Sequence, residues 1–230
     1  MVTKGQKFSQ KKDGIFIFEV SYLLDVVEKM LIGTIFHEHL CYHSVKAMSR
    51  FLESHDMELI HVERGPEQGG SIVGYAQFTN GSKNIQDSVA KLLKLEKERK
   101  LDRPETIRGM YEGLESVKTE VRNLITDLRK ENKTIAGFGA ARAGTTLLSY
   151  FGIGSQLDFL VDDNKTKHYK FSPGDKIEVL PTSDIYKNPP DYLLILAWLH
   201  ADKIIESHKQ YLEEGGSFLR LFPGVTEIKS

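Results

Sequence analysis

A regular alternation of strand-like and helix-like segments between residues 134 and 222 constrains the fold more than any other feature. Apolar runs typical of buried strands occupy 134–140, 157–162, 192–197 and 217–222, with a weaker run at 177–180. Helical spacing of apolar residues occupies 144–151 and 201–213. Such alternation is typical of a parallel sheet with helices on its faces. The sequence therefore predicts an α/β fold, with a small Rossmann-like domain over 133–230.

The residues before this region show a different pattern. We expect a strand at 15–20, a helix at 22–31, and two antiparallel strands at 57–64 and 71–78 joined by a turn. Ser44 suits the N-cap of a helix over 44–55. Its apolar stripe would bury Val45, Met48, Phe51 and Leu52.

A highly charged helical stretch at 85–132 follows, and it is interrupted at 101–104. Pro104 suits the first turn of the second helix in this stretch. We therefore expect four segments: a loose tail at 1–12, a partial sheet at 13–82, a helical connector at 83–132 and the Rossmann-like domain at 133–230.

Charge and cysteine content exclude several classes of partner. The 230 residues carry a formal net charge of -1, which gives no electrostatic reason to expect nucleic acid or an anionic membrane as partner. A single cysteine excludes an internal disulfide and fits a reducing cytoplasm, where we expect the protein to reside. No apolar run is long enough to span a bilayer.

A glycine-rich turn follows the strand expected at 134–140. Gly137, Gly139 and Gly144 would let the backbone approach a ligand, and Arg142 would add a phosphate contact. Arg142 stands where the third glycine of a dinucleotide fingerprint would be, and Asp162 ends the next strand, where a ribose-binding carboxylate is expected. The turn alone is compatible with a nucleotide or nucleotide-sugar phosphate, a dinucleotide, or no ligand.

A dense histidine cluster lies at 37–43. If this segment were extended, His37, His39, Cys41 and His43 would share one side and could bind a metal. Alternatively, Glu38 would orient a neighbouring histidine for acid–base catalysis. A third interpretation is that the imidazoles only satisfy hydrogen bonds of a loop.

Several short runs recur in the order found in S-adenosylmethionine-dependent nucleotide-sugar C-methyltransferases, which the chain resembles over about residues 13–223. The runs are 18–25, 34–42, 69–71, 137–140, 144–148, 161–164, 167–168, 173–174, 190–198 and 211–218. The resemblance is to the C-terminal portion of that family, namely the last strands of the methyltransferase domain (13–82) and the whole second domain. The cysteine-rich zinc module and the glycine-rich donor strand with which such enzymes begin have no counterpart here.

The resemblance implies a mechanism and a set of site residues. A base removes a proton beside the keto group of the sugar, and the resulting enolate takes the methyl group of S-adenosylmethionine. His39 would be the base, with Glu38 orienting it or binding the sugar, and His37 beside them. The substrate would lie on residues of the second domain, namely Gly137, Gly139, Arg142, Gly144, Thr145, Asp162, Asn164 and Lys167.

Two residues depart from the family pattern. Phe36 replaces the tyrosine that usually precedes His-Glu-His, and Ala143 replaces a basic residue before Gly144, with Arg142 one position earlier. We therefore expect the substrate-side part of a C-methyltransferase that needs a separate chain to supply the donor pocket. Its unpaired sheet edge predicts a homodimer or poor solubility. Two alternatives are a non-catalytic nucleotide or nucleotide-sugar binding module and a small NAD- or metal-binding protein.

Overall fold

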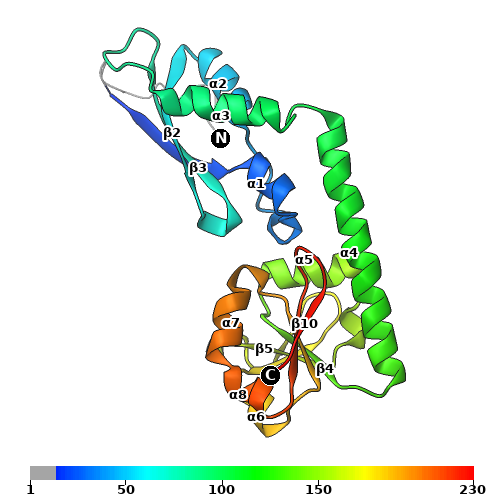
Figure 1. Ribbon diagram of the computed structural model, residues 1–230. Coiled ribbons are helices and arrows are strands. Elements are labelled where there is room, and N and C mark those ends of the chain that lie inside the picture. Colours follow the sequence, from blue (N-terminus) through cyan, green and yellow to red (C-terminus); the bar gives the residue numbers. More distant parts are fainter. Residues whose placement is uncertain (1–13) are drawn as a thin grey trace. The chain divides into compact units, whose positions relative to one another are not determined.

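The chain forms two compact units in the computed structural model, which describes residues 14–230 (Figure 1). Within the described residues, the first unit contains 14–28 and 41–107, and the second contains 29–40 and 108–230. These boundaries differ from the expected segments at two points. Residues 29–40 belong to the second unit, and the connector expected at 83–132 is divided between the two units after residue 107. The tail expected at 1–12 lies outside the described residues.

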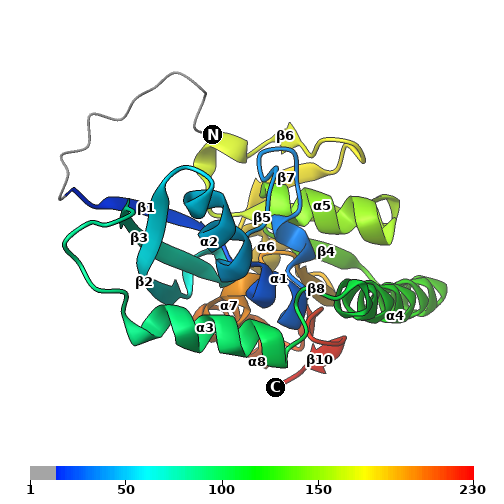
Figure 2. The same cartoon turned by 90° about the horizontal axis from the view of Figure 1, so that it is seen from above.

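The first unit is a three-stranded antiparallel sheet with helices beside it (Figure 2). The central strand β3 pairs with β1 and with β2, and β2 carries an irregularity between Leu59 and His61. In chain order the elements are β1 (Phe16–Ser21), α1 (Leu23–Glu28), α2 (Val45–Glu53), β2 (Met57–Gly65), η2 (Glu67–Gly69), β3 (Ser71–Phe78) and α3 (Asp87–Glu98).

Helix α2 begins as the sequence predicts. The Ser44 side chain accepts a hydrogen bond from the Ala47 amide, and Val45 and Leu52 are buried. The prediction that Phe51 is buried is wrong, since 46% of its surface is exposed. Phe51 lies about 100° round the helix from Leu52 and about 60° from Met48, at the margin of the buried stripe.

Two of the runs that carry the family resemblance meet in the first unit. Ser71 donates a hydrogen bond to Glu19 at 2.8 Å. The buried Asp25 carboxylate lies against Gly70, where any Cβ would fall 2.2 Å from the Asp25 side chain. Arg64 donates two hydrogen bonds to this carboxylate, at 2.9 and 2.8 Å. Bidentate pairing of this kind compensates the cost of burying the Asp25 charge.

The second unit is built on a seven-stranded sheet in the order β10-β9-β8-β4-β5-β7-β6. The five central strands are parallel, and the edge strands β6 and β10 are antiparallel to their neighbours. Its strands are β4 (Ile135–Phe138), β5 (Phe159–Asp162), β6 (Lys170–Phe171), β7 (Glu178–Pro181), β8 (Tyr192–Ile195), β9 (Ser217–Arg220) and β10 (Thr226–Ile228). The predicted α/β class with a Rossmann-like sheet is confirmed.

Helices cover both faces of this sheet. Helices α4 (Pro104–Lys130) and α5 (Arg142–Phe151) pack on one face, and α6 (Asp184–Lys187), α7 (Ala201–Ser207) and α8 (Lys209–Glu213) pack on the other. Helix α4 begins at Pro104, as predicted. The single helix predicted at 201–213 is two, because His208 leaves helical geometry with φ of −123°. Within residues 14–230 no helix is both long and apolar enough to cross a membrane.

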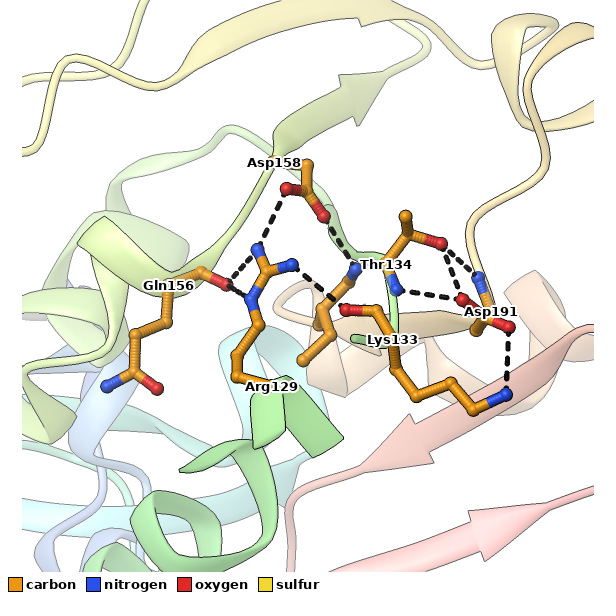
Figure 3. Close-up of polar contacts among 7 residues, drawn as sticks. Arg129, Lys133, Thr134, Gln156, Asp158 and Asp191 are labelled. Atoms are coloured by element: carbon orange, nitrogen blue, oxygen red, sulfur yellow. Dashed lines mark hydrogen bonds and ion pairs between the residues drawn. The ribbon is translucent and has the colours of Figure 1, made fainter. Parts of the chain in front are cut away.

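A polar network fixes the amino ends of the central strands (Figure 3). The Arg129 guanidinium donates to the Gln156 carbonyl at 2.6 and 2.9 Å and to Asp158 at 2.9 Å. Asp191 accepts from the amide and hydroxyl of Thr134, both at 2.8 Å. These contacts hold together the end of α4 and the starts of β4 and β8. They lie at the amino ends of the strands, whereas the glycine-rich turn lies at the carboxyl ends.

The strand order creates a switch point between β4 and β8. From β4 the chain adds β5 and β7 on one side, and then crosses to add β8 and β9 on the other. In open parallel sheets, ligands bind outside the carboxyl ends of the strands at such a point. The glycine-rich turn follows β4 and therefore lies there.

Candidate functional site

The glycine-rich turn between β4 and α5 is tightly packed against the protein. Gly139 has φ of +103° and donates its amide to the Val161 carbonyl at 2.8 Å. A Cβ at this position would fall 2.8 Å from the Ala197 Cβ. Gly137 is buried inside the sheet, where a Cβ would fall 2.6 Å from Leu160. Glycine at these positions is therefore required by the packing of β4 against β5 and β8.

Gly144 performs the close packing that a third glycine performs in a dinucleotide turn. A Cβ on Gly144 would lie 2.7 Å from the carbonyl oxygen of Gly139. Helix α5 can therefore approach the strand only with glycine here. The dinucleotide pattern predicts this close-packing glycine at position 142. The structure has it at 144, because the turn is two residues longer than in that pattern.

The Asp162 carboxylate at the end of β5 locks the turn. It accepts hydrogen bonds from the amides of Ala140 and Asn164 and from Lys167 Nζ, at 2.8, 2.9 and 2.8 Å. Burial opposes the charge of Asp162, but these hydrogen bonds outweigh burial and hold its pKa below the ordinary value. Both oxygens of the carboxylate expected to contact a ribose are thus engaged within the protein. The neighbouring Asp163 is exposed and accepts from Thr182 at 2.6 Å.

An open hollow of about 270 Å³ lies beside the turn. Gly139, Gly144, Thr145 and Lys167 line it, together with the exposed Phe171. The Asn164 side chain instead caps the 3-10 turn η4 (Lys165–Lys167) by accepting from the Thr166 amide. Four of the eight substrate residues expected from the sequence therefore share one hollow.

The histidine-bearing loop packs on the start of α5 in the same unit. The 3-10 turn η1 (Ile32–Thr34) places Ile32 in the core beneath α5. A Cβ on Gly33 would fall 2.6 Å from Trp198 Nε1 and 3.3 Å from the Ala143 Cβ. Only glycine at position 33 allows this close approach, which ties the loop to the carboxyl end of β8.

Residues 36–39 form a turn rather than an extended strand, because the His39 amide donates to the Phe36 carbonyl at 2.9 Å. The predicted metal site required an extended segment with His37, His39, Cys41 and His43 on one side, and the turn rules this arrangement out. Cys41 and His43 belong to the first unit. Among residues 14–230, no group of three or more histidine, cysteine, aspartate or glutamate side chains is placed to hold a metal ion.

The turn places its side chains against Arg142, at the first position of α5. Glu38 forms an ion pair with Arg142, and its other oxygen lies 4.0 Å from His37 Nε2. The Arg142 guanidinium lies 5.2 Å from the centre of the Phe36 ring. The Phe36 and His39 rings are 4.3 Å apart and inclined by 33°. Nδ1 of His39 is buried.

A second open hollow, of about 630 Å³, lies between this loop and α5. Its polar lining comes from His37, Arg142, Thr145, Thr146, Ser149 and Tyr150. Thr145 and Pro173 line both hollows, so the two hollows adjoin. The structure therefore brings the histidine loop and the glycine-rich turn, which are about a hundred residues apart in sequence, to adjoining parts of one surface.

Two residues of this site were not singled out from the sequence. Trp198 holds the loop through Gly33, and Tyr150 lines the second hollow while its hydroxyl donates to Glu115 at 2.6 Å. Burial and this contact with Glu115 raise the pKa of Tyr150. Trp198 directly follows an apolar strand at the switch point, and this position is the sequence feature that could have predicted its contact with the loop.

Comparison with known proteins gives the family of the chain. Residues 66–223 match the model of the C-methyltransferase C-terminal domain. The chain is 34% identical over 212 residues to the C-methyltransferase NovU of Streptomyces niveus, and the match covers 92% of this chain and 50% of NovU. The chain thus spans half the length of that curated relative. The family model alone covers most of the chain, and we conclude that this protein belongs to the C-methyltransferase C-terminal domain family.

Proposed function

We propose that this chain is the substrate-side part of an S-adenosylmethionine-dependent C-methyltransferase that acts on a keto nucleotide-sugar. The observation that carries the proposal is the attachment of the histidine loop to the glycine-rich turn. Gly33 packs on Trp198 and Ala143, and Glu38 pairs with Arg142. A candidate base and a candidate phosphate site are thus held in one compact unit.

The two hollows suit the two ends of such a substrate. The smaller one, with Thr145, Lys167 and the amino-terminal end of α5, would take the diphosphate, because a helix N-terminus and a cation favour anions. The larger one, with its threonine and serine hydroxyls and His37, would take the sugar. The shared Thr145 would lie near the junction of phosphate and sugar.

His39 is the proposed general base. Nδ1 is buried, so Nε2 is the atom that would accept the proton from the carbon beside the keto group. The electron pair left on that carbon becomes the enolate, which is the nucleophile for the methyl group that the donor supplies when bound. A histidine is suited to this step because its ordinary pKa lies near neutral pH.

Two observations argue against a donor site on the glycine turns of this chain. In the first unit, Asp25 fills the space beside the Gly70 turn. In the second unit, both oxygens of Asp162 are engaged within the protein. We propose that a separate chain supplies the donor, and no step through it is assigned to residues of this one.

Proton exchange tests the base without a methyl donor. The chain is mixed with a keto nucleotide-sugar in D₂O, and loss of the proton beside the keto group is followed by NMR. We expect exchange by the unaltered chain and a rate at least about 100-fold lower for His39→Gln. His55→Gln, which alters an exposed histidine of the first unit, is the matched control and should exchange normally.

The same experiment separates the main alternative. A non-catalytic binding module is favoured by Phe36, which lacks the hydroxyl of the usual tyrosine. Such a module would bind the nucleotide-sugar, as measured by calorimetry, yet give no exchange above the buffer rate. Exchange that is equally fast in His39→Gln would show that His39 is not the base.

A further inference from the structure

The two departures from the family pattern touch each other. Phe36 replaces a tyrosine in the loop, and the basic residue of the turn stands at 142 instead of 143. In the structure the Arg142 guanidinium lies 5.2 Å from the centre of the Phe36 ring. We propose that Arg142 is a positioning residue, which orders the loop and through Phe36 sets the orientation of His39. This inference rests on the proposed role of His39.

A continuous series of contacts carries the proposal. Arg142 pairs with the Glu38 carboxylate and lies over Phe36, so a single guanidinium contacts two positions of the turn. Phe36 in turn packs on the His39 imidazole, with ring centres 4.3 Å apart. The hydrogen bond from the His39 amide to the Phe36 carbonyl closes the turn. Moving Phe36 therefore moves His39.

The place of the basic residue follows from the packing of α5. Ala143 faces the loop at Gly33, where a Cβ on the glycine would fall 3.3 Å from the Ala143 Cβ. A long side chain at 143 would push the loop away from Trp198. One position earlier, the side chain lies about 100° round the helix and reaches Glu38 and Phe36 instead. A basic residue at 142 and a small residue at 143 thus belong to one arrangement.

The arrangement also removes Arg142 from phosphate binding. Its guanidinium faces Glu38 and Phe36, and it lines the larger hollow, whereas Lys167 lines the smaller one. Loss of Arg142 should therefore lower the rate of proton transfer by a larger factor than it lowers the affinity for the nucleotide-sugar. A phosphate-binding arginine would show the opposite pattern.

The first measurement is NMR of the histidine ring protons in the full chain, which needs no substrate. A ring packed on Phe36 experiences its ring current, so the His39 signal should be displaced from that of an exposed histidine. Arg142→Ala and Phe36→Leu should each move the signal toward the exposed value. Phe36→Tyr keeps an aromatic ring under the guanidinium and should keep the displaced signal.

The second measurement is the proton exchange assay. Because exposed ion pairs and cation–π contacts are individually weak, Arg142→Ala should lower kcat about threefold to tenfold, with a smaller change in KM. Arg142→Lys, which keeps the charge but not the planar group, should recover part of the loss. The Arg142→Ala, Phe36→Leu double variant should be no slower than the slower single variant, since both changes break the same series of contacts from Arg142 to His39.

The control is Lys209→Ala, which removes an exposed ion pair with Glu206 on α7. It should leave kcat, KM and the His39 signal as they are. A raised KM with kcat and the His39 signal unchanged would overturn the proposal, and so would additive losses in the double variant. A third outcome separates this inference from the proposed function. If neither the unaltered chain nor any variant gives proton exchange, the proposed function fails. If the His39 signal still moves in Arg142→Ala, the positioning contact stands.

Discussion

At the scale of single residues, Asp162 is the side chain on which the glycine-rich turn depends most directly. Its two oxygens accept two backbone amides and Lys167. Asp162→Asn places an amide nitrogen against one of these donors, so we expect the second unit to lose about 1–3 kcal/mol of stability at pH 7. Urea unfolding followed by circular dichroism measures this loss.

The loss should depend on pH in a defined direction. The pKa of Asp162 is lowered by folding, so its charge stabilises the folded state above the unfolded pKa of about 3.9 and ceases to do so as pH falls through the folded value. The difference between the unaltered chain and Asp162→Asn should therefore shrink below about pH 4. Asp163→Asn, at the exposed neighbour, is the control. An equal loss for both variants would contradict a special role for Asp162.

The limits of sequence reasoning are clearest at this scale. Glycine spacing indicated a tight turn after β4, because glycine has few other reasons to recur there. The ion pair between Arg142 and Glu38 could not be predicted, because the two residues are 104 positions apart and ion pairs leave no periodic signal in a sequence. Asp162 was expected to contact a ligand, because the sequence does not show that its carboxylate binds the Ala140 amide and Lys167 within the protein.

At the scale of elements, the five parallel strands and the start of α4 were predicted, whereas the two edge strands and the break within 201–213 were not. Apolar runs, weakest at β7, indicate the parallel strands, and Pro104 indicates the start of α4. Strands β6 and β10 contain two and three residues, which is too short for an alternating pattern. The loop 29–40 follows elements of the first unit in sequence, but its contacts belong to the second, and only tertiary packing decides this.

Attachment of that loop to the second unit can be tested with the only tryptophan of the chain. Trp198 lies against Gly33, where a Cβ would fall 2.6 Å from the indole nitrogen. Gly33→Ala should displace the loop, expose Trp198 to water and shift its fluorescence emission to longer wavelength. Proton exchange should fall with it, because the loop carries His39.

Gly109→Ala is the matched control for this change. Gly109 lies in α4, and a Cβ added there would meet no neighbouring atom within 4 Å, so alanine adds helix propensity without a clash. We expect about 0.5–1 kcal/mol of added stability and unchanged Trp198 emission. Unchanged emission in Gly33→Ala as well would show that the loop does not depend on this contact.

At the scale of the whole molecule, the chain joins a Rossmann-like unit to a small antiparallel unit and spans half the length of a curated C-methyltransferase. In dinucleotide folds a carboxylate at the position of Asp162 binds the adenosine ribose, whereas both oxygens of Asp162 are engaged within this protein. The glycine-rich turn therefore lacks the ribose contact that a dinucleotide-type donor site would use.

We therefore expect calorimetric titration of the chain with S-adenosylmethionine to give no binding, while a keto nucleotide-sugar binds and stabilises the second unit against urea. Stabilisation should rise with ligand concentration, because ligand that binds only the folded state shifts the unfolding equilibrium. Addition of a separate donor-binding methyltransferase domain should then give methyl transfer that neither chain gives alone. Micromolar binding of the donor would instead place its pocket within this chain, and the glycine-rich turn would be the first place to look for it.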